Sequence, residues 1–368
     1  MPTADELINA EAVRGLAAIF DDTEAKGTPV WSAVRAAAEE LGPLSLSQRA
    51  RSVAAAIVDD GHSYSRLSAT TRSALENPAL TGWMIWPLTE AVAAMATAHG
   101  DAGEFDDGLN LLAALTPRLT SEFAIRTFLN ADLDRALAAI ADWTSYDDDA
   151  VRRLASEGTR PKLPWAKQVP RLIKEPGRTR PILDALYRDG SEFVRRSVAN
   201  HLNDVSRLSA ETAHSTATAW SSAPDAHTAA LIRHGMRTLI KAGDPAALHL
   251  LGFSADLDQL QVQGPHLAET SVPLGGAITF AADITNIGDD VAVLAIDYLI
   301  HHRKANGTTT AKTFKLTTRS LAPRERLTIS KSHSFKPITT RRYYPGTHAV
   351  ELQVNGRRLG YTEFQLDA

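Results

Sequence analysis

The sequence contains Ala150-Val151-Arg152-Arg153 and, 43 residues further on, Phe193-Val194-Arg195-Arg196. A repeat of this length lies within the range of about 40–47 residues that is typical of stacked pairs of helices. Such repeats often carry arginines only to link one pair to the next, so these four arginines have a structural interpretation besides a functional one. The spacing predicts a solenoid built from helical pairs.

The sequence on both sides of this repeat, up to residue 254, consists of short segments rich in alanine and leucine. Their apolar residues recur three and four positions apart, which predicts amphipathic helices. Short breaks such as Gly42-Pro43 and Gly243-Asp244-Pro245 separate them. The clearest predicted helices are residues 31–41, 46–58, 83–98, 105–115, 133–143 and 209–220. Residues 1–254 are therefore predicted to form a HEAT-like α-helical solenoid.

The pattern changes at about residue 255, where apolar and polar residues begin to alternate. This alternation predicts strands at residues 277–287, 291–299, 309–317, 327–335 and 348–354. Asn306-Gly307 and Asn355-Gly356 are typical of tight β-hairpin turns. We expect the linker within residues 251–263 and an immunoglobulin-like β-sandwich over residues 255–368. The predicted fold class is mainly α, with this sandwich at the C-terminal end.

The composition excludes several kinds of site. The 368 residues include no cysteine, which excludes disulfides, thiolate metal sites and cysteine nucleophiles. The chain has no Walker phosphate loop, no dinucleotide-binding glycine motif and no HExxH zinc motif. His301-His302 lies in a predicted strand, where neighbouring side chains face opposite sides of a sheet. With no apolar run long enough to span a membrane and no signal-peptide pattern, we expect a cytoplasmic protein without metal or cofactor.

Charge is distributed unevenly along a chain whose net charge is −4. Residues 1–150 carry 10 basic and 23 acidic residues, whereas residues 151–207 carry 13 basic and 6 acidic residues. A further 13 basic residues lie between Arg303 and Arg358, where Glu325 and Glu351 are the only acidic residues. Two concentrated basic regions are typical of a protein that binds a polyanion, although two solvated basic faces explain them too.

Two segments of the predicted solenoid contain carboxylates that helix formation does not require. In the first, Glu122 follows Thr120 and Ser121, either of which is a possible helix cap, so the carboxylate has a simple interpretation as a partner of the helix dipole. In the second, Glu157 ends a predicted helix, where a carboxylate opposes the dipole at a cost in stability.

A loop after Glu157 presents Trp165 between Pro164 and polar residues rather than within an apolar stripe. Trp165 is therefore either exposed for function or buried, as most tryptophans are. A third segment, residues 193–204, adds further basic residues and Asp204. The residues predicted to contact DNA are Arg126, Arg152, Arg153, Arg160, Lys162, Lys167, Arg195, Arg196, His201, Arg341 and Arg342.

Four stretches carry a resemblance to a known family: Gly82-Trp83-Met84-Ile85-Trp86-Pro87 and residues 120–128, 155–165 and 237–253. The most specific of them reads Ala-Ser-Glu-Gly-Thr-Arg-Pro-Lys-Leu-Pro-Trp over residues 155–165. Together they resemble the AlkC branch of bacterial alkylation-repair DNA glycosylases. The resemblance covers most of the chain, including the β domain that the related AlkD branch lacks.

The resemblance implies excision of cationic N-methylated bases, such as 3-methyladenine and 3-methylcytosine, from double-stranded DNA. It also implies that a concave helical surface captures bent DNA without extruding the lesion fully, unlike a base-flipping glycosylase. It places Glu122, Glu157 and Trp165 in the active site, with Asp204 as a further candidate. Carboxylates suit this chemistry because they stabilise the positive charge that develops on the sugar, and an indole face attracts a cation. No lysine stands out as a Schiff-base nucleophile, which favours a monofunctional hydrolase.

Two other functions are compatible with the sequence. A non-enzymatic HEAT-repeat scaffold for a protein partner explains the repeated arginines, but not two basic regions together with the loop at residues 157–165. A DNA-binding module without excision activity differs from a glycosylase in its chemistry alone. We expect the protein to be a monomer.

Overall fold

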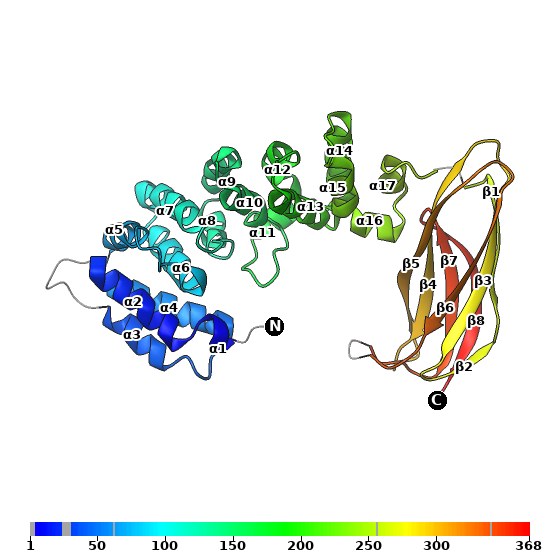
Figure 1. Cartoon of the computed structure of the whole chain (residues 1–368), viewed down its shortest axis with the longest axis horizontal. Coiled ribbons are helices and arrows are strands. Elements are labelled where there is room, and N and C mark those ends of the chain that lie inside the picture. The colour runs from blue at the N-terminus through cyan, green and yellow to red at the C-terminus, as the bar shows by residue number, and fades with distance from the viewer. Residues whose placement is uncertain (1–3, 24–30, 62, 255–256, 339–340) are drawn as a thin grey trace. The chain divides into compact units, whose positions relative to one another are not determined.

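The structure is a computed structural model that describes residues 4–23, 31–61, 63–254, 257–338 and 341–368 (Figure 1). Contacts within the chain divide it into two compact units, Met1–Gly235 and Met236–Ala368. Each unit has its own core. Among the described residues, no helix has the length and apolar character that crossing a membrane requires.

The first unit consists of helices joined by short turns (Figure 1). Its α-helices are α1 (Ala4–Leu7), α2 (Ala10–Thr23), α3 (Ser32–Glu39), α4 (Leu46–Gly61), α5 (Tyr64–Ala74), α6 (Ile85–Ala96), α7 (Ala102–Leu115), α8 (Ile125–Ala131), α9 (Leu133–Asp142), α10 (Asp149–Glu157), α11 (Pro170–Lys174), α12 (Arg180–Leu186), α13 (Glu192–Ser206), α14 (Ala210–Ser222) and α15 (Thr228–Gly235). Three 3₁₀ turns, η1 (Gly82–Met84), η2 (Trp143–Ser145) and η3 (Pro176–Thr179), lie between them.

The helices stack in succession, as expected of a solenoid. Helix α10 packs against α13, and α13 packs against α15. The two copies of the repeated Val-Arg-Arg motif lie on α10 and α13, so the repeat marks equivalent helices of successive pairs. Asp and Ser side chains cap several helix starts, as when Asp132 accepts a hydrogen bond from the backbone N–H of Arg135. The predicted HEAT-like helical architecture is confirmed.

The second unit begins with two short helices, α16 (Arg237–Ala242) and α17 (Pro245–Leu250), and continues as two packed sheets. One sheet has the order β1-β3-β6 and the other the order β2-β8-β7-β4-β5. The strands are β1 (Leu260–Leu267), β2 (Ser271–Pro273), β3 (Ala277–Asn286), β4 (Ala292–Arg303), β5 (Thr309–Leu321), β6 (Arg326–Ser334), β7 (Gly346–Val354) and β8 (Arg357–Asp367). All pairings are antiparallel except that of β2 with β8.

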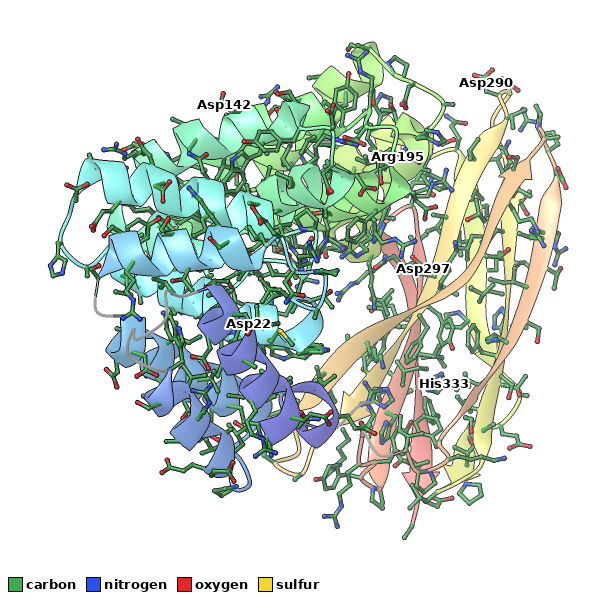
Figure 2. All side chains as sticks on the ribbon, turned by 60° about the vertical axis from the view of Figure 1, so that its left-hand side comes forward. Asp22, Asp142, Arg195, Asp290, Asp297 and His333 are labelled. Carbon is green, nitrogen blue, oxygen red and sulfur yellow. The ribbon has the colours of Figure 1, made fainter. Side chains whose placement is uncertain are left out.

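The alternating pattern of the sequence produces this sandwich directly. Every second residue of β3, from Ile278 to Asn286, is buried, and Phe280 and Tyr298 pack in the core between the sheets. Asn355 and Gly356 both have positive φ, as the predicted tight turn between β7 and β8 requires. Asp290 marks the turn between β3 and β4 at one end of the sandwich (Figure 2).

The boundary between the units differs from the position at which helices give way to strands. The sequence pattern changes at about residue 255, and residues 255–256 lie outside the described residues. The contacts instead place α16 and α17 with the sandwich, because the turn at Gly243 approaches the β7–β8 turn at Gly356 too closely for any side chain at either position. The limits 1–254 and 255–368 for two domains stay a prediction.

His301 and His302 face opposite sides of their sheet, as expected for neighbours in a strand. His302 is buried between the sheets, whereas His301 is half-buried on the outer face and lies 2.9 Å from a carboxylate oxygen of Glu351. Among the described residues, no group of three or more His, Asp or Glu side chains is arranged to hold a metal ion.

Candidate active site

A pocket of about 510 Å³ opens in the first unit, beside the C-terminal end of α10. Its wall is largely aromatic and aliphatic and contains two carboxylates. The lining residues are Trp83, Trp86, Leu119, Thr120, Glu122, Phe123, Glu157, Arg160, Leu163, Pro164 and Trp165. Three of the four residues predicted as catalytic are therefore brought to one pocket, although up to 43 positions separate them in the sequence.

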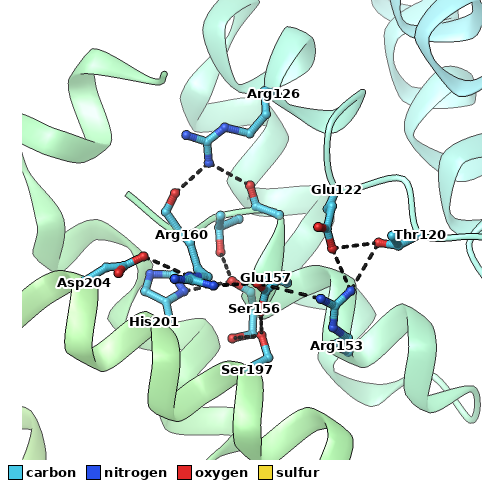
Figure 3. Close-up of polar contacts among 12 residues, drawn as sticks. Thr120, Glu122, Arg126, Arg153, Ser156, Glu157, Arg160, Ser197, His201 and Asp204 are labelled. Carbon is cyan, nitrogen blue, oxygen red and sulfur yellow. Dashed lines mark hydrogen bonds and ion pairs between the residues drawn. The ribbon is translucent and has the colours of Figure 1, made fainter. Parts of the chain in front are cut away.

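Glu157 is the last residue of α10, as the sequence predicts, and its side chain is buried. One of its carboxylate oxygens accepts a hydrogen bond from Arg160 Nη1 at 2.6 Å, and the other accepts one from Ser197 Oγ at 2.7 Å (Figure 3). Charge-assisted hydrogen bonds of this kind are short and strong, so they offset the unfavourable end of the helix dipole. The carboxylate is thereby held in one orientation at the pocket wall.

Glu122 does not lie in a helical first turn, contrary to the expectation from its neighbours. Helix α8 begins only at Ile125, and Thr120 and Ser121 do not cap it; Ser121 Oγ donates to the carbonyl of Leu112 instead. The Glu122 carboxylate accepts a hydrogen bond from Arg153 Nη1 at 2.7 Å. Its position is therefore set by a tertiary contact with α10 and not by a local helix cap.

Two arginines link the carboxylates into an alternating chain (Figure 3). Arg153 contacts Glu122 at 2.7 Å and Glu157 at 3.7 Å, and Arg160 joins Glu157 to Asp204 with hydrogen bonds of 2.6 and 2.8 Å. Burial opposes the charge on Arg160, but its bonds with Asp204 and Glu157 raise its pKa above the ordinary value. Three carboxylates and two guanidiniums leave this network with one net negative charge.

Asp204 does not line the pocket, because it lies behind Arg160 and is only 3% exposed. Its carboxylate reaches the site through the Arg160 guanidinium, to which it binds through Nε. The arrangement fits a residue that positions Arg160.

Trp165 is 97% exposed, which decides between the two interpretations of its sequence context. Its backbone has φ 63°, in the left-handed region that side chains other than glycine rarely adopt. A conformation of this kind costs about 1–3 kcal/mol and persists only where surrounding structure enforces it. A large apolar side chain is therefore held both in strain and in solvent at the edge of a pocket that contains two carboxylates.

Sequence reasoning missed the other aromatic residues of the site. Trp86 stacks on Phe123 with ring centroids 4.7 Å apart, and Trp83 lies 6.2 Å from Trp86. All three line the pocket with Trp165. The signal was present in the sequence, since Trp83 and Trp86 flank the start of α6, but their distance from Glu122 along the chain gave no reason to group them.

The residues predicted to contact DNA fall into three groups. Lys162, Lys167, Arg196 and Arg342 are exposed, and Arg341 is half-buried. Another group is occupied by partners within the fold: Arg153 and Arg160 bind the site carboxylates, Arg152 pairs with Asp189, and Arg195 donates to the carbonyls of Asp189 and Gly190. The third group, Arg126 and His201, is buried.

His201 and Arg126 have structural roles in place of the predicted DNA contacts. His201 is fully buried; its Nδ1 donates to the carbonyl of Ser156, and burial lowers its pKa to about 3, so the ring is neutral. Arg126 is 1% exposed, and burial lowers its pKa to about 10. Neither side chain has surface from which to reach a phosphate.

The chain matches known proteins over both units. The family described as "Uncharacterised protein YhaZ, C-terminal Ig-like domain" matches residues 261–368, so the sandwich is immunoglobulin-like. The Uncharacterized protein YhaZ of Bacillus subtilis (strain 168) is 35% identical over 262 residues, which are 71% of this chain and 72% of that protein. A solved structure of the Pseudomonas fluorescens alkylpurine DNA glycosylase AlkC, bound to DNA containing an abasic site analog, matches with a TM-score of 0.80 and 31% identity over 100% of both chains.

Proposed function

This chain belongs to the family of AlkC and YhaZ, and from that membership we propose that it is a DNA glycosylase of alkylation repair. The proposal is that it hydrolyses the N-glycosidic bond of cationic alkylated bases, 3-methyladenine and 3-methylcytosine, in double-stranded DNA. It acts as a monomer and as a hydrolase without lyase activity. The lesion is captured at the surface of the helical unit without full extrusion from the duplex.

One observation carries the proposal. Trp165 is exposed and held in the left-handed region of backbone space, and it lies in the same pocket as Glu122 and Glu157. A folded chain gains nothing in stability from an exposed, strained tryptophan. Such outliers cluster at functional sites, and a tryptophan beside carboxylates is suited to a cationic ligand.

The chemistry follows from the charges of the lesion and the site. N3-methylation gives the base a positive charge, so it leaves the sugar without an added proton. Positive charge then develops on the sugar, and the carboxylates of Glu122 and Glu157 stabilise that charge and orient the attacking water. Arg153 and Arg160 fix both carboxylates in advance, which avoids the cost of reorganising them during the reaction.

The aromatic residues complete the proposed recognition of the lesion. Trp83, Trp86 and Trp165 present ring faces or edges around the pocket, where a desolvated cation gains about 2 kcal/mol from one well-placed indole. A neutral base gains no such attraction. The pocket's net negative charge acts in the same direction, because it favours a cationic base over a neutral one.

The exposed cations supply the proposed contacts with the DNA backbone. Lys162 and Lys167 lie on the loop that carries Trp165, so phosphate contacts there would place the duplex against the pocket. Arg341 and Arg342 are proposed to contribute from the immunoglobulin-like unit. Deleting residues 260–368 is expected to weaken DNA binding and excision together.

The direct test is release of free bases from alkylated duplex DNA by the purified protein. We expect 3-methyladenine and 3-methylcytosine to be released, with abasic DNA as the second product and no strand cleavage. Undamaged DNA of the same sequence is the control. Tight binding without any base release would instead support a DNA-binding module, and neither binding nor release would support the protein scaffold.

A further inference from the structure

We propose that Arg126 is a positioning residue that clamps both ends of the Trp165 loop, residues 158–168, and so holds Trp165 at the pocket. The effect of this clamp on catalysis rests on the proposed function. The clamp itself does not, since it follows from contacts within the chain.

The contacts of the Arg126 guanidinium span the loop from end to end. Nη1 donates to the carbonyl of Gly158 at 3.0 Å and to that of Arg160 at 2.7 Å, both at the start of the loop (Figure 3). Nε donates to the carbonyl of Lys167 at 2.9 Å, near the end of the loop. One rigid, planar group therefore ties together two backbone positions that are nine residues apart in the sequence.

The burial of Arg126 shows that these bonds are specific. The side chain is 1% exposed, and the acceptors that the structure records for its guanidinium are three backbone carbonyls. Burying a charge is costly unless hydrogen bonds satisfy it. A buried aliphatic residue at this position would avoid that cost, but it would leave the three carbonyls without their donor.

Neighbouring residues support the same closure of the loop. Gly158 allows the chain to approach α8, since a Cβ atom at this position would lie 2.8 Å from Ile125 Cγ2. Asn130, one turn beyond Arg126 on α8, donates from Nδ2 to the carbonyl of Gln168 at 3.0 Å. Both ends of the loop are thus fixed to α8, and Leu163 is buried between them.

The strain at Trp165 is a consequence of these fixed ends. The loop leaves the Arg126 guanidinium at Gly158 and must return to it at Lys167. Pro161 and Pro164 restrict the backbone conformations with which it can close this turn. The unfavourable φ of 63° at Trp165 is then maintained by the clamp and not by contacts of the indole, which is exposed. Without the clamp, the backbone at Trp165 can relax and the indole leaves its place at the pocket.

The first arm of the test measures the loop without reference to activity. Trypsin cleaves after Lys162 and Lys167, both inside the loop. In the full-length Arg126→Gln protein we expect cleavage at these two sites roughly 10-fold faster than in the unaltered protein, because lost buried hydrogen bonds make local opening easier. Cleavage at the unaltered rate would overturn the proposal.

Arg49→Gln is a matched control. Arg49 is also buried, at 2% exposure, and also donates to backbone carbonyls, those of Ile8 at 2.9 Å and Leu44 at 3.0 Å. It belongs to the same helical unit, and these two acceptors lie outside the Trp165 loop. We expect this variant to lose a similar amount of thermal stability while the loop sites remain protected. Equal exposure of the loop in both variants would overturn the proposal, since general loosening would then explain the effect.

Asn130→Ala keeps the test decisive if Arg126→Gln does not fold. Its contact with Gln168 lies at the surface, so the variant should fold and should show a smaller increase in cleavage after Lys167. No increase in Asn130→Ala, together with an unfolded Arg126→Gln protein, would overturn the clamp.

The second arm tests the catalytic consequence. We expect single-turnover excision by Arg126→Gln to fall roughly 10- to 100-fold, as a small misplacement of a catalytic group does. Affinity for an uncleavable abasic-site duplex should fall less than excision does, since Arg126 has no surface for DNA and affects binding only through Lys162 and Lys167 of the loop. Unchanged excision with an exposed loop would remove the catalytic role. If the unaltered protein released no base, the proposed function would be wrong. The trypsin experiment would still test the clamp, because it does not depend on activity.

Discussion

The molecule contains two buried polar clusters that differ in how their polar groups are paired. The active-site cluster of the helical unit consists of Glu122, Arg153, Glu157, Arg160 and Asp204, and each of these charges has a partner of opposite charge. The histidine cluster of the sandwich consists of His302, His333 and His348, whose rings pack around Phe335. Each of these rings has one buried nitrogen that finds no hydrogen-bond partner among the described residues.

The two clusters differ in whether their side chains carry charge. In the first cluster, groups of opposite charge pair with one another, and the cluster borders an open pocket. Burial lowers the pKa of His302 to about 3 and that of His333 to about 4, so the second cluster is neutral at pH 7. Its three rings are buried in the sandwich, and His333 marks their place in Figure 2. A buried polar cluster therefore indicates an active site where its charged groups border a pocket that admits a ligand.

The largest expected effect comes from removing one charge of the active-site cluster. Glu157→Gln keeps the size of the side chain but loses the negative charge, which should lower single-turnover excision by about 10²–10³-fold. The thermal midpoint should fall only slightly, because Arg160 keeps Asp204 as its partner.

Asp204→Asn is the control for this prediction, since it breaks the other ion pair of Arg160 away from the pocket. We expect comparable destabilisation and a smaller loss of excision. Near-normal excision by a stable Glu157→Gln protein would leave Glu122 as the principal carboxylate.

Substitution of an exposed and of a buried tryptophan should affect different properties, excision in one case and stability in the other. Trp165→Ala should lower excision by roughly 10-fold or more through loss of a cation–π face, without lowering the thermal midpoint, because the indole is exposed. Trp220→Ala should cost about 3–5 kcal/mol of unfolding free energy, since Trp220 is buried against Tyr187. Thermal denaturation beside excision measures both. A large loss of stability in Trp165→Ala would mean that the indole packs in solution.

The histidine cluster predicts acid sensitivity. The folded-state pKa of His333 lies below the ordinary 6.5, so the unfolded chain binds a proton first as the pH falls. Its contribution to stability is complete above about pH 6.5 and is lost progressively as the pH falls toward 4. Between pH 7 and pH 5 this histidine should cost roughly 1–2 kcal/mol of unfolding free energy.

His333→Gln should reduce this pH dependence, because glutamine does not titrate and can still accept a hydrogen bond from Tyr298. The matched control is His301→Gln, since His301 lies outside the core on β4, a strand of the other sheet. Thermal unfolding measured between pH 7 and pH 5 tests the comparison. Identical slopes for His333→Gln and the unaltered protein would show that other groups carry the acid sensitivity.

The smallest expected effect concerns charges that belong to neither cluster. Affinity for duplex DNA should fall linearly with salt on logarithmic axes, and Lys162→Ala should reduce that slope by about 1. Arg14→Ala, in the acidic N-terminal region, is the control and should leave the slope unchanged. A slope near zero for the unaltered protein would exclude a binding mode based on phosphate contacts.

Local periodicity was sufficient to predict the architecture. Spacing of three and four residues predicted helices that lie within a few residues of α3, α4, α7, α9 and α14, and alternation predicted strands that match β3 to β7. Strands β1, β2 and β8 were missed. Gly264-Pro265 interrupts the alternation of β1, Gly360 interrupts that of β8, and β2 has only three residues. Helices and hairpins are encoded by neighbouring residues, which is why the sequence alone was enough for them.

The site depended on the sequence for its residue types and on the tertiary structure for its geometry. The unfavourable position of Glu157 at a helix end and the position of Trp165 outside an apolar stripe were visible in the sequence. The exposure of Trp165, the aromatic wall from Trp83 and Trp86, and the burial of Arg126 and His201 were not. The sequence does not distinguish an arginine that binds phosphate from one that binds three backbone carbonyls. The packing of α8 and α13 against α10 and the loop that follows it determines which partner each side chain contacts.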